Sequence, residues 1–561
     1  MKKPRSILLL LLLPVAFSLG FLSHIQGDYF EISKNLEIFG HLFKEINKVY
    51  VDETSPTDLM RTHIDAVVGS LDPYTNFYSE SQIDQSKLIY SGQYSGIGAE
   101  VGKRNDQIII LELTGEGPAD MAGLRVGDQL LQIDNIDITG NKLNLEEINN
   151  LILGERGSEV RLKIQRSEGG LPLTISAERG GEEKVQETVS YYDMVNDSVG
   201  YILLENFTGS AGKEVGAAFK KLKEKHSLSG LILDLRANPG GRLDQAVDIS
   251  NLFLPQGELV VEMRGRARES KNKFYTRMPP LDTEIPLVIL VNGRSASASE
   301  IVAGSIQDLD RGVIVGRRSF GKGLVQNFRP LTQTPTGQTT TQMKVTIAKY
   351  YTPSGRCIQA IDYANRNADG SVGRIPDSLV NEFQTRAGRV VFDGGGVEPD
   401  ILVEKPGSNP ILRALQEQKL IFDFANQYAS ETDSIPVPRE FEVNQQTFDD
   451  FVAFVLEKEF DFQTQTEDQL SQLALEINKS ENQELIDELD QLRQTLQEKK
   501  MQDLTTYQHL ITPYLKRAII SRFYFAEGVL EASFVDDQDI LKAVDILGNA
   551  DRYKKILHGT Q

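Results

Sequence analysis

A serine-rich turn offers the clearest candidate for a nucleophile. Ser297 lies in the segment Asn292-Gly-Arg-Ser-Ala-Ser-Ala-Ser-Glu300, between an apolar run at Leu287–Val291 and a helical pattern at Ile301–Leu309. A serine hydroxyl at the start of a helix has backbone N–H groups beside it, and these can hold the oxyanion that develops during acyl transfer. Serine is also a favoured helix cap, so its placement alone does not establish catalysis.

A lysine further along the chain could supply the general base. Lys322 lies in the segment Gly316-Arg-Arg-Ser-Phe-Gly-Lys-Gly323. A free lysine has a pKa of about 10.4, so a base working near neutral pH needs surroundings that lower this value, such as glycines and apolar neighbours. Gln326 lies four positions on, and on a strand it would share a face with Lys322 and orient the amine through an uncharged hydrogen bond.

The same segment also fits the GxxxxGK pattern of a phosphate-binding loop. Two features argue against that reading. The residue after Lys322 is Gly323, where a phosphate-binding loop has the Ser or Thr that binds Mg²⁺. The following Leu324–Phe328 reads as a strand, whereas the phosphate would need the N-terminus of a helix.

Composition excludes several classes of protein. The chain has 561 residues, of which 40% are hydrophobic, so it is long enough for several domains with apolar cores. Its formal net charge of −20 disfavours nucleic acid as a partner. Cys357 is the one cysteine, which rules out an internal disulfide, and none of the six histidines lies in an HExxH zinc motif.

The elements that must position these residues fall into three patterns. Residues 31–86 show apolar positions at helical spacing, with breaks at prolines. Residues 88–181 alternate short β-rich runs with glycine turns, around one helical stretch at Leu145–Leu153. From Gly200 to about Glu404 the order is strand, glycine turn and helix, repeated, with runs such as Leu231–Leu235 that are typical of strands buried on both faces.

The remaining chain is less regular. Residues 361–396 look like a long excursion from the α/β core. Beyond Pro406 the sequence is acidic, rich in glutamine and helical. Leu485, Leu489, Leu492 and Leu496 have the seam spacing of paired helices, although a helical lid or bundle packed on the core is the interpretation we favour for this region.

The amino terminus predicts export. Lys2, Lys3 and Arg5 precede an apolar run over residues 7–22, which is the order of a secretory signal. The run has 16 residues and no clear cleavage site follows, so a cleaved signal peptide and a retained membrane anchor both stay open. We expect the rest of the protein to lie in the periplasm or cell envelope, where it could be anchored to the inner membrane.

Taken together, these motifs resemble those of the carboxyl-terminal processing peptidases, also called tail-specific proteases (family S41). The resemblance rests on Ser297 in S-A-S-A-S-E, Lys322 in F-G-K-G and Gln326 four residues later, and it extends from about residue 35 to 405. It implies that these three residues form a Ser–Lys–Gln catalytic site. It also implies that an amide of Gly240 or Gly241, together with that of Ala298, forms the oxyanion hole.

A second motif resembles the carboxylate-binding loop of a PDZ domain. It comprises Tyr94, Ser95, Gly96, Ile97 and Gly98. Free amides in such a loop would bind the terminal carboxylate of a peptide. The resemblance implies polypeptide substrates with free C-termini and no cofactor or metal. The sequence leaves open an adaptor protein and a homo-oligomer.

We therefore expect an α/β multidomain protein that cleaves substrates captured by their C-termini. A crotonase-like ββα peptidase core would carry an inserted β-rich PDZ domain. The parts are a signal peptide or membrane anchor (1–27), a helical N-terminal region (28–86), the PDZ domain (87–182), the peptidase core (183–405) and a helical C-terminal region (406–561). The alternative is a catalytically silent PDZ scaffold that binds the tails of envelope proteins.

Overall fold

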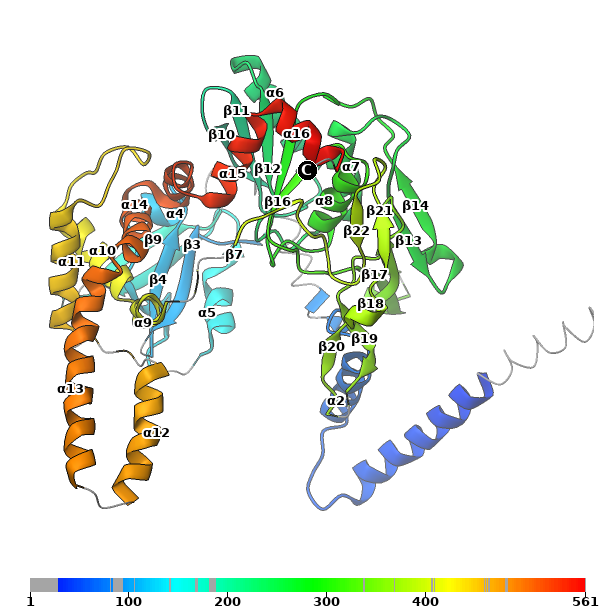
Figure 1. Cartoon of the computed structure of the whole chain (residues 1–561). Coiled ribbons are helices and arrows are strands. Elements are labelled where there is room, and N and C mark those ends of the chain that lie inside the picture. Colours follow the sequence, from blue (N-terminus) through cyan, green and yellow to red (C-terminus); the bar gives the residue numbers. More distant parts are fainter. Residues whose placement is uncertain are drawn as a thin grey trace, which may run out of the picture. The chain divides into compact units, whose positions relative to one another are not determined.

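The computed structural model in Figure 1 describes most of the chain beyond the amino terminus. It covers residues 29–559 except 81, 84–93, 105, 141–142, 167–169, 181–187, 336, 338, 368, 405–406, 408, 459, 461, 463–464 and 480–482. The apolar run at residues 7–22 therefore lies outside the described residues. The chain divides into two compact units, Met1–Ser79 with Phe328–Val345, and Glu80–Asn327 with Thr346–Gln561.

The first unit is helical at its start, as the sequence predicts. Its described elements are a helix over residues 29–49, α2 (Pro56–Gly69) and β1 (Asn76–Tyr78). α2 begins at Pro56 because the Ser55 side chain caps it and proline fits the first turn. The helical expectation for residues 28–86 is wrong at β1, which pairs antiparallel with Gln342–Lys344 of β18 (Thr339–Tyr351).

The β-rich region forms a compact domain in the second unit. Its elements are β2 (Tyr94–Ser95), β3 (Ala99–Arg104), β4 (Gln107–Leu113), α4 (Pro118–Met121), β5 (Gln129–Ile133), β6 (Ile136–Asp137), α5 (Leu145–Ile152), β7 (Gly154–Glu155), β8 (Glu159–Gln165) and β9 (Leu173–Glu178). The main sheet has the order β3-β4-β5-β8-β9, so β3 is an edge strand, and α5 contacts it. Ile110, Leu130, Ile148 and Leu162 are buried in its core.

A second, six-stranded sheet forms the centre of the α/β region, in the order β10-β11-β12-β15-β16-β23. Every neighbouring pair except β10–β11 is parallel. Its strands are β10 (Val189–Met194), β11 (Val199–Leu204), β12 (Gly230–Asp234), β15 (Leu287–Val291), β16 (Val313–Gly316) and β23 (Ile401–Leu402). The apolar runs predicted at Leu231–Leu235 and Leu287–Val291 are confirmed as central strands.

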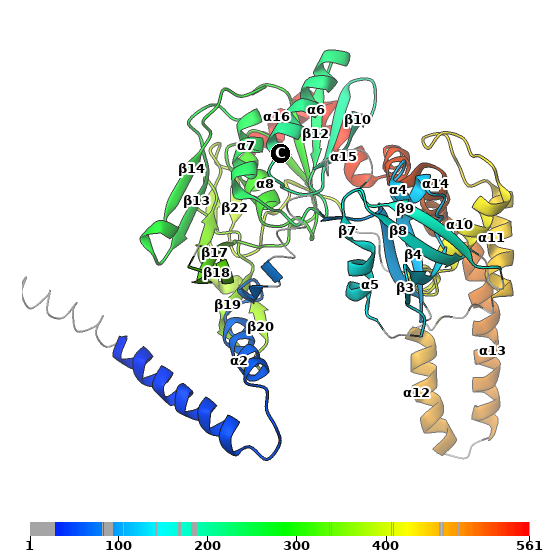
Figure 2. The same ribbon diagram turned by 180° about the vertical axis from the view of Figure 1, so that it is seen from behind.

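Helices from distant parts of the sequence cover the two faces of this sheet. Leu233 and Ile289 belong to a core cluster with α6 (Ala211–Lys225), α7 (Leu243–Phe253) and α8 (Ala298–Asp308). The alternate residues, such as Ile232 and Val288, pack with α15 (Gln538–Leu547) and α16 (Ala550–Leu557). Figures 1 and 2 show these two helical layers from opposite sides. The last helices of the chain therefore complete the core of the α/β region.

The chain between the central strands also forms a further sheet and two hairpins. The elements are β13 (Leu259–Gly265), η1 (Arg268–Ser270), β14 (Asn272–Tyr275), β17 (Leu324–Gln333), β18, β19 (Ile361–Arg366), β20 (Val372–Arg374), η2 (Asp377–Leu379), β21 (Glu382–Gln384) and β22 (Val390–Phe392). The strand predicted at Leu324–Phe328 is the beginning of β17. The excursion at residues 361–396 consists of the hairpins β19–β20 and β21–β22.

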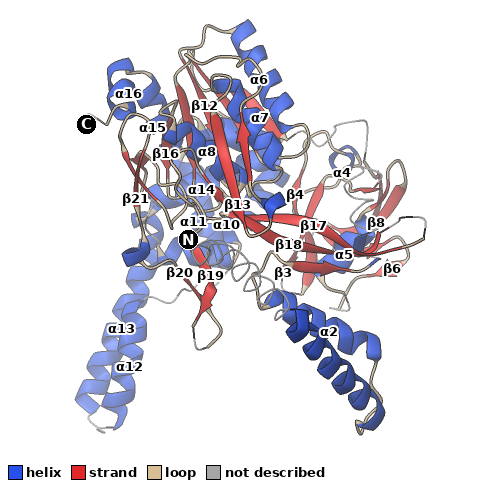
Figure 3. Ribbon diagram, turned by 90° about the vertical axis from the view of Figure 1, so that its right-hand side faces the viewer, coloured by secondary structure: helices blue, strands red, loops and turns tan. Residues whose placement is uncertain are grey.

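The helices before α15 share a separate apolar core. They are α9 (Pro410–Glu417), α10 (Leu420–Glu431), α11 (Gln445–Glu457), α13 (Gln483–Thr506) and α14 (Gln508–Ser533), whereas no described residue of α12 (Gln465–Lys479) belongs to this core. α12 and α13 contact each other side by side, as Figure 3 shows. In α13 Leu489 is buried but Leu492 is 47% exposed, so the leucine seam is not uniformly covered. Among the helices of the described residues, none is long and apolar enough to cross a bilayer.

The same helices contact the β-rich domain. α14 is interrupted at Phe525, whose φ of 55° and ψ of −161° are not helical, and its ring packs against the core of the β-rich domain. A β-carbon placed on Gly115 would lie 2.6 Å from that ring. On α10, Asp423 accepts two hydrogen bonds from the Arg104 guanidinium of β3.

Candidate active site

Three loops meet at one edge of the central sheet. They follow β12, β15 and β16, which are parallel neighbours and therefore end at the same edge, where open α/β sheets usually bind ligands. The first carries Gly240 and Gly241, the second carries Ser297, and the third carries Lys322. The residues predicted for catalysis therefore come from adjacent loops.

Ser297 directly precedes α8 and has a strained backbone conformation. It is the N-cap residue, with φ 57° and ψ −111°, and its exposed fraction is 7%. Positive φ is rare for residues other than glycine and is held by surrounding structure, frequently at functional sites. Ala298 is the first residue of the helix, and its amide donates to no other described residue. A polar group placed beside Ser297 would therefore find an unused N–H donor.

A buried carboxylate joins the serine loop to the lysine loop. One oxygen of Glu300, Oε2, accepts hydrogen bonds from the backbone amides of Ser297 (2.8 Å) and Lys322 (2.9 Å). The other, Oε1, accepts from the Ser319 hydroxyl (2.5 Å) and the Gly321 amide (2.7 Å). Two amides that share one acceptor atom lie within a few ångström of each other. The structure thus brings the backbones of Ser297 and Lys322 together.

Glu300 is a site residue that the sequence reasoning missed. Its spacing from Ser297 is that of a capping box, in which the N3 Glu accepts from the N-cap amide, and this signal was present in the sequence. Burial raises the pKa of the Glu300 carboxyl, while the hydrogen bonds from Ser319 and from the amides of Ser297, Gly321 and Lys322 act in the opposite direction. The carboxyl therefore binds its proton more tightly than an exposed glutamate does.

The surroundings of Gln326 differ from the sequence expectation. Lys322 is half-buried and precedes β17, which begins at Leu324, so a shared strand face does not relate it to Gln326. The reason is that residues 321–323 are not part of a strand, and β17 begins only after Lys322. Gln326 is half-buried on β17 and its amide nitrogen donates to the Thr346 hydroxyl of β18 at 3.2 Å.

The glycine turn after β12 lies against Ser297. Gly240 has φ +97°, and a β-carbon there would lie 2.8 Å from Ser297 Cβ and 2.9 Å from the Ala298 nitrogen. Its amide donates to Asn238 Oδ1 at 2.8 Å. Gly241, with φ +149°, lies instead against the Phe207 carbonyl, and its amide donates to no other described residue. Only glycine fits at Gly240, because any side chain would collide with the serine loop.

Asn238 fixes the glycine turn to the serine loop. Its carbonyl oxygen accepts from the Ala296 amide (3.0 Å) and from the Ser299 hydroxyl (3.0 Å). Its side-chain nitrogen donates to the Leu204 carbonyl at 2.7 Å, and the residue is fully buried. These bonds satisfy the polar groups of Asn238 and hold the two loops at a fixed separation.

Comparison with known proteins identifies the architecture. The model of "Peptidase family S41" matches residues 198–365, that of a "PDZ domain" matches 111–166, and that of "Probable PDZ-protease, C-terminal helical domain" matches 411–547. A carboxy-terminal-processing protease of Bartonella bacilliformis is 35% identical over 331 residues, which cover 58% of this chain and 73% of the relative. This chain belongs to peptidase family S41.

Further relatives agree with this S41 assignment. A carboxy-terminal processing protease CtpA of Bacillus subtilis is 30% identical over 56% of this chain and 65% of its own length. Among solved structures, a photosystem II D1 C-terminal processing protease aligns over 65% of this chain and 92% of its own, with 23% identity and a TM-score of 0.35, so the assignment rests on the sequence relatives. The protein is a serine-type C-terminal processing peptidase with a PDZ domain, and the silent-scaffold alternative is set aside.

The PDZ domain of this S41 peptidase presents the predicted glycine loop beside its edge strand. The carbonyl oxygens of Gly96, Ile97 and Gly98 accept from the amides of Gly180, Ala119 and Thr114 inside the domain. Tyr94 and Ser95 form β2, which pairs with β7, and Gly98 has φ +73°. The amides of Gly96, Ile97 and Gly98 donate to no other described residue. The loop therefore has N–H groups available for an anion.

Proposed function

We propose that this S41 peptidase cleaves peptide bonds with Ser297 as nucleophile and Lys322 as general base. The observation that carries the proposal is that one oxygen of the Glu300 carboxylate, Oε2, accepts hydrogen bonds from the backbone amides of both residues. Lys322, neutral when reactive, removes the proton of the Ser297 hydroxyl as the oxygen attacks the scissile carbonyl. The amine leaves with a proton returned from Lys322, and water then hydrolyses the acyl-enzyme.

The oxyanion of the tetrahedral intermediate needs preorganised donors. The amide of Ala298 has no partner among the described residues, and an amide of the Gly240–Gly241 turn supplies the second donor. In this proposal the side chain of Gln326 orients the amine of Lys322. Gln326 is itself positioned by the hydrogen bond that its side-chain nitrogen donates to the Thr346 hydroxyl. No metal or organic cofactor takes part in these steps.

The PDZ domain selects substrates by their ends. We propose that the loop Tyr94–Gly98 binds the terminal carboxylate of a polypeptide through the amides of Gly96, Ile97 and Gly98, while the peptide extends along the edge strand β3. Ser95, Gly96 and Gly98 are half-buried and Ile97 is buried, so this part of the loop gives the carboxylate a partly dry site. An extended tail adds a strand to the free edge of the sheet.

The proposed location is outside the cytoplasm, in the periplasm or cell envelope. It rests on Lys2, Lys3 and Arg5 before the apolar run at residues 7–22, which is a signal peptide or an anchor to the inner membrane. Fractionation of cells that express the full chain, with carbonate extraction of membranes, tests this proposal. A wholly cytoplasmic protein in its full-length form would contradict it.

Cleavage of an unfolded reporter with a free C-terminus tests the dyad. The full chain is assayed in mild detergent as wild type, Ser297→Ala and Lys322→Ala, with product masses read by mass spectrometry. Ser305→Ala removes another buried hydroxyl from α8, and Lys220→Ala removes an exposed amine from α6, so these are the matched controls. We expect cleavage to disappear in the first two variants only. Equal fragment patterns in all five proteins would contradict the proposal.

Amidation of the reporter's C-terminus tests the carboxylate loop. Because the amide form lacks the charge that the N–H groups bind, we expect kcat/KM to fall by at least tenfold. A small serine-reactive phosphonate that labels Ser297 directly serves as the control, since its rate should not depend on the tail. Equal cleavage of amidated and free reporters would refute this role of the PDZ loop.

A further inference from the structure

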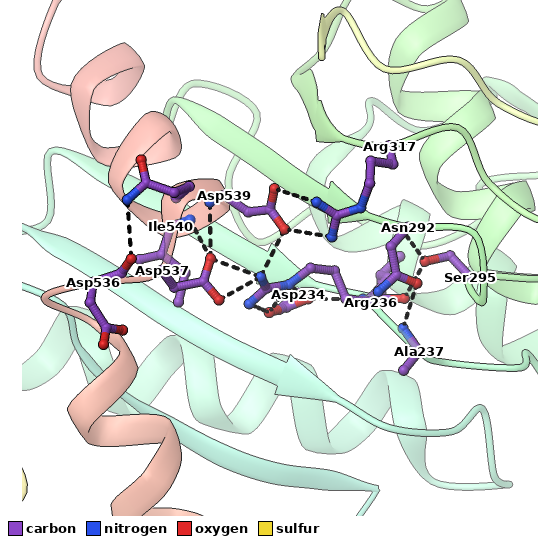
Figure 4. Close-up of polar contacts among 12 residues, drawn as sticks. Asp234, Arg236, Ala237, Asn292, Ser295, Arg317, Asp536, Asp537, Asp539 and Ile540 are labelled. Atoms are coloured by element: carbon purple, nitrogen blue, oxygen red, sulfur yellow. Dashed lines mark hydrogen bonds and ion pairs between the residues drawn. The ribbon is translucent and has the colours of Figure 1, made fainter. Parts of the chain in front are cut away.

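The N-terminus of α15, which precedes the final described helix α16, presents two carboxylates to the edge of the central sheet that carries the catalytic loops. Asp537 is the N-cap of α15, and its Oδ1 accepts from the amides of Asp539 (2.9 Å) and Ile540 (3.2 Å). Asp539 lies in the first turn, where the helix dipole favours a negative charge. Figure 4 shows both side chains directed away from the helix, toward the residues that follow β12 and β16.

Arg236 receives both carboxylates. Its Nη1 donates to Asp537 Oδ1 and Oδ2 (2.9 and 2.8 Å) and to Asp539 Oδ2 (2.9 Å), while its Nε and Nη2 donate to Asp234 at 2.6 to 3.1 Å. The side chain of Arg236 is 15% exposed and that of Asp539 is 4% exposed. Charge-assisted hydrogen bonds with this little solvent are strong and directional. They join positions that are 301 and 303 residues apart in the chain.

Asp539 also binds a second arginine. Arg317, which directly follows β16, donates to Asp539 at 3.1 and 3.4 Å. The strands β12 and β16 lie on either side of β15, which leads into the serine loop. One carboxylate therefore bridges the two loops that flank Ser297.

Both arginines lie at the bases of loops used in the proposed reaction. Arg236 precedes Gly240 by four positions, and Arg317 precedes Lys322 by five. The residue after Arg236, Ala237, has φ +59°, and its amide donates to Asn292 Oδ1 (3.0 Å) at the start of the serine loop. A non-glycine residue keeps such a φ only where the surrounding structure holds its backbone in place. For Ala237, the ion pairs of the preceding residue, Arg236, provide this restraint.

We propose that Asp537 and Asp539 are positioning residues of the peptidase, which hold the oxyanion turn and the lysine loop in place through Arg236 and Arg317. This inference rests on the proposed Ser297–Lys322 reaction. On this inference, α15 supports catalysis in addition to packing on the central sheet. A misplacement of about 1 Å can cost about a hundredfold in rate, so loss of the two charges affects kcat. Substrate capture by the PDZ domain does not involve them, so KM changes little.

The test compares two ways of loosening the C-terminal helices from the same sheet. Asp537→Asn with Asp539→Asn removes the charges, while Asn at position 537 keeps the helix cap. The matched control is Tyr553→Phe, because the Tyr553 hydroxyl of α16 bonds the amide (2.9 Å) and carbonyl (3.1 Å) of Leu287 at the opposite end of β15. Wild type, Ser297→Ala and these variants are assayed as full chains for kcat, KM and thermal unfolding.

We expect the double variant to lose between about tenfold and a hundredfold in kcat, with KM within about twofold. Tyr553→Phe should lower the unfolding temperature and keep the wild-type kcat below it. Wild-type kcat in the double variant, or an equal loss of kcat in Tyr553→Phe, would overturn the inference. If the double variant does not fold, the single variant Asp537→Asn tests the inference by the same criteria. Its side chain is 20% exposed, so the substitution disturbs the fold less.

The Ser297→Ala arm separates this inference from the proposed function. Residual cleavage at the wild-type rate in Ser297→Ala would mean that the proposed reaction is wrong, whatever the aspartate variants do. An inactive Ser297→Ala together with a fully active double variant would contradict the positioning role alone.

Discussion

The backbone amides of Ser297 and Lys322, which are 25 positions apart in the sequence, donate to the same oxygen of Glu300 at 2.8 and 2.9 Å. The two residues are far from being neighbours in the sequence. Their proximity depends on a third side chain that is fully buried and accepts four hydrogen bonds. The geometry of the proposed dyad is therefore set by a residue that takes no direct part in the chemistry.

Replacement of that carboxylate should damage both stability and cleavage. Glu300→Gln keeps the shape but has one acceptor oxygen, so in either orientation its NH₂ group faces two donors. Two buried donors would lose their partners, at roughly 1–3 kcal/mol each. We expect the free energy of unfolding to fall by about 2–6 kcal/mol and cleavage to drop below detection. Urea unfolding followed by tyrosine fluorescence measures the first, and reporter cleavage measures the second.

Glu398→Gln is the control for that substitution. Glu398 accepts a hydrogen bond from Arg318 near the same loop, but its side chain is 51% exposed, and exposed pairs of this kind contribute at most about 1 kcal/mol. Comparable losses in both variants would show that Glu300 has no special role.

The effect of Glu300→Gln should depend on pH. Burial raises the pKa of Glu300 above its ordinary value of 4.5, so the folded protein binds this proton more tightly than the unfolded chain. The stability that this proton gives is fully present below pH 4.5 and is lost as the pH rises through the folded pKa. Glutamine does not titrate. The stability difference between wild type and variant should therefore be larger at pH 4 than at pH 8, and an opposite slope would contradict the direction of the shift.

Gly240 should not tolerate a side chain. Gly240→Ala meets both a positive φ and contacts of 2.6 Å to the Ala296 carbonyl and 2.8 Å to Ser297 Cβ. Gly257→Ala is the matched control, because Gly257 has φ +90° but nothing within 4 Å of its added β-carbon. We expect Gly257→Ala to cost about 1 kcal/mol and keep the wild-type kcat, and Gly240→Ala to abolish cleavage. Full activity in Gly240→Ala would show that the turn is not adjacent to the reacting serine.

The contact between the PDZ domain and α14 should show coupling in a double-mutant cycle. Gly115→Ala crowds the ring of Phe525, with 2.6 Å between the new β-carbon and Cδ2, and overpacking of this kind costs about 1–3 kcal/mol. In a Phe525→Ala background the same substitution should cost little, because the ring is gone. Gly373→Ala, with open space around it, should change stability by less than about 0.5 kcal/mol. Additive effects at Gly115 and Phe525 in thermal unfolding would argue against this contact.

Local patterns predicted the central strands well. Leu287–Val291 is apolar throughout, and this is typical of a strand buried on both faces, which β15 is. The strand after the FGKG segment, Leu324–Phe328, was also predicted correctly, and its prediction was one reason to reject a phosphate-binding loop here. The strand β1 was missed because Asn76–Tyr78 is short and its partner, Gln342–Lys344, lies far away in the sequence.

The candidate site was predicted in part. Ser297, Lys322 and the glycine turn have local motifs that drew attention to them. Glu300 had a local signal as well, its capping-box spacing from Ser297, but nothing in that spacing indicates that the same carboxylate also binds the loop of Lys322. The pairing of Arg236 with Asp537 and Asp539 had no signal in the sequence, because a charge pair between positions about 300 residues apart produces no local pattern.

The order of strands, turns and helices follows from the sequence, because backbone preferences and the spacing of apolar residues act over a few positions. Which helices cover the second face of the sheet, and which carboxylates meet Arg236 and the amides beside Lys322, depends on the folded chain. Those contacts form only when buried apolar faces have brought distant segments together, and their strength comes from the exclusion of water around them.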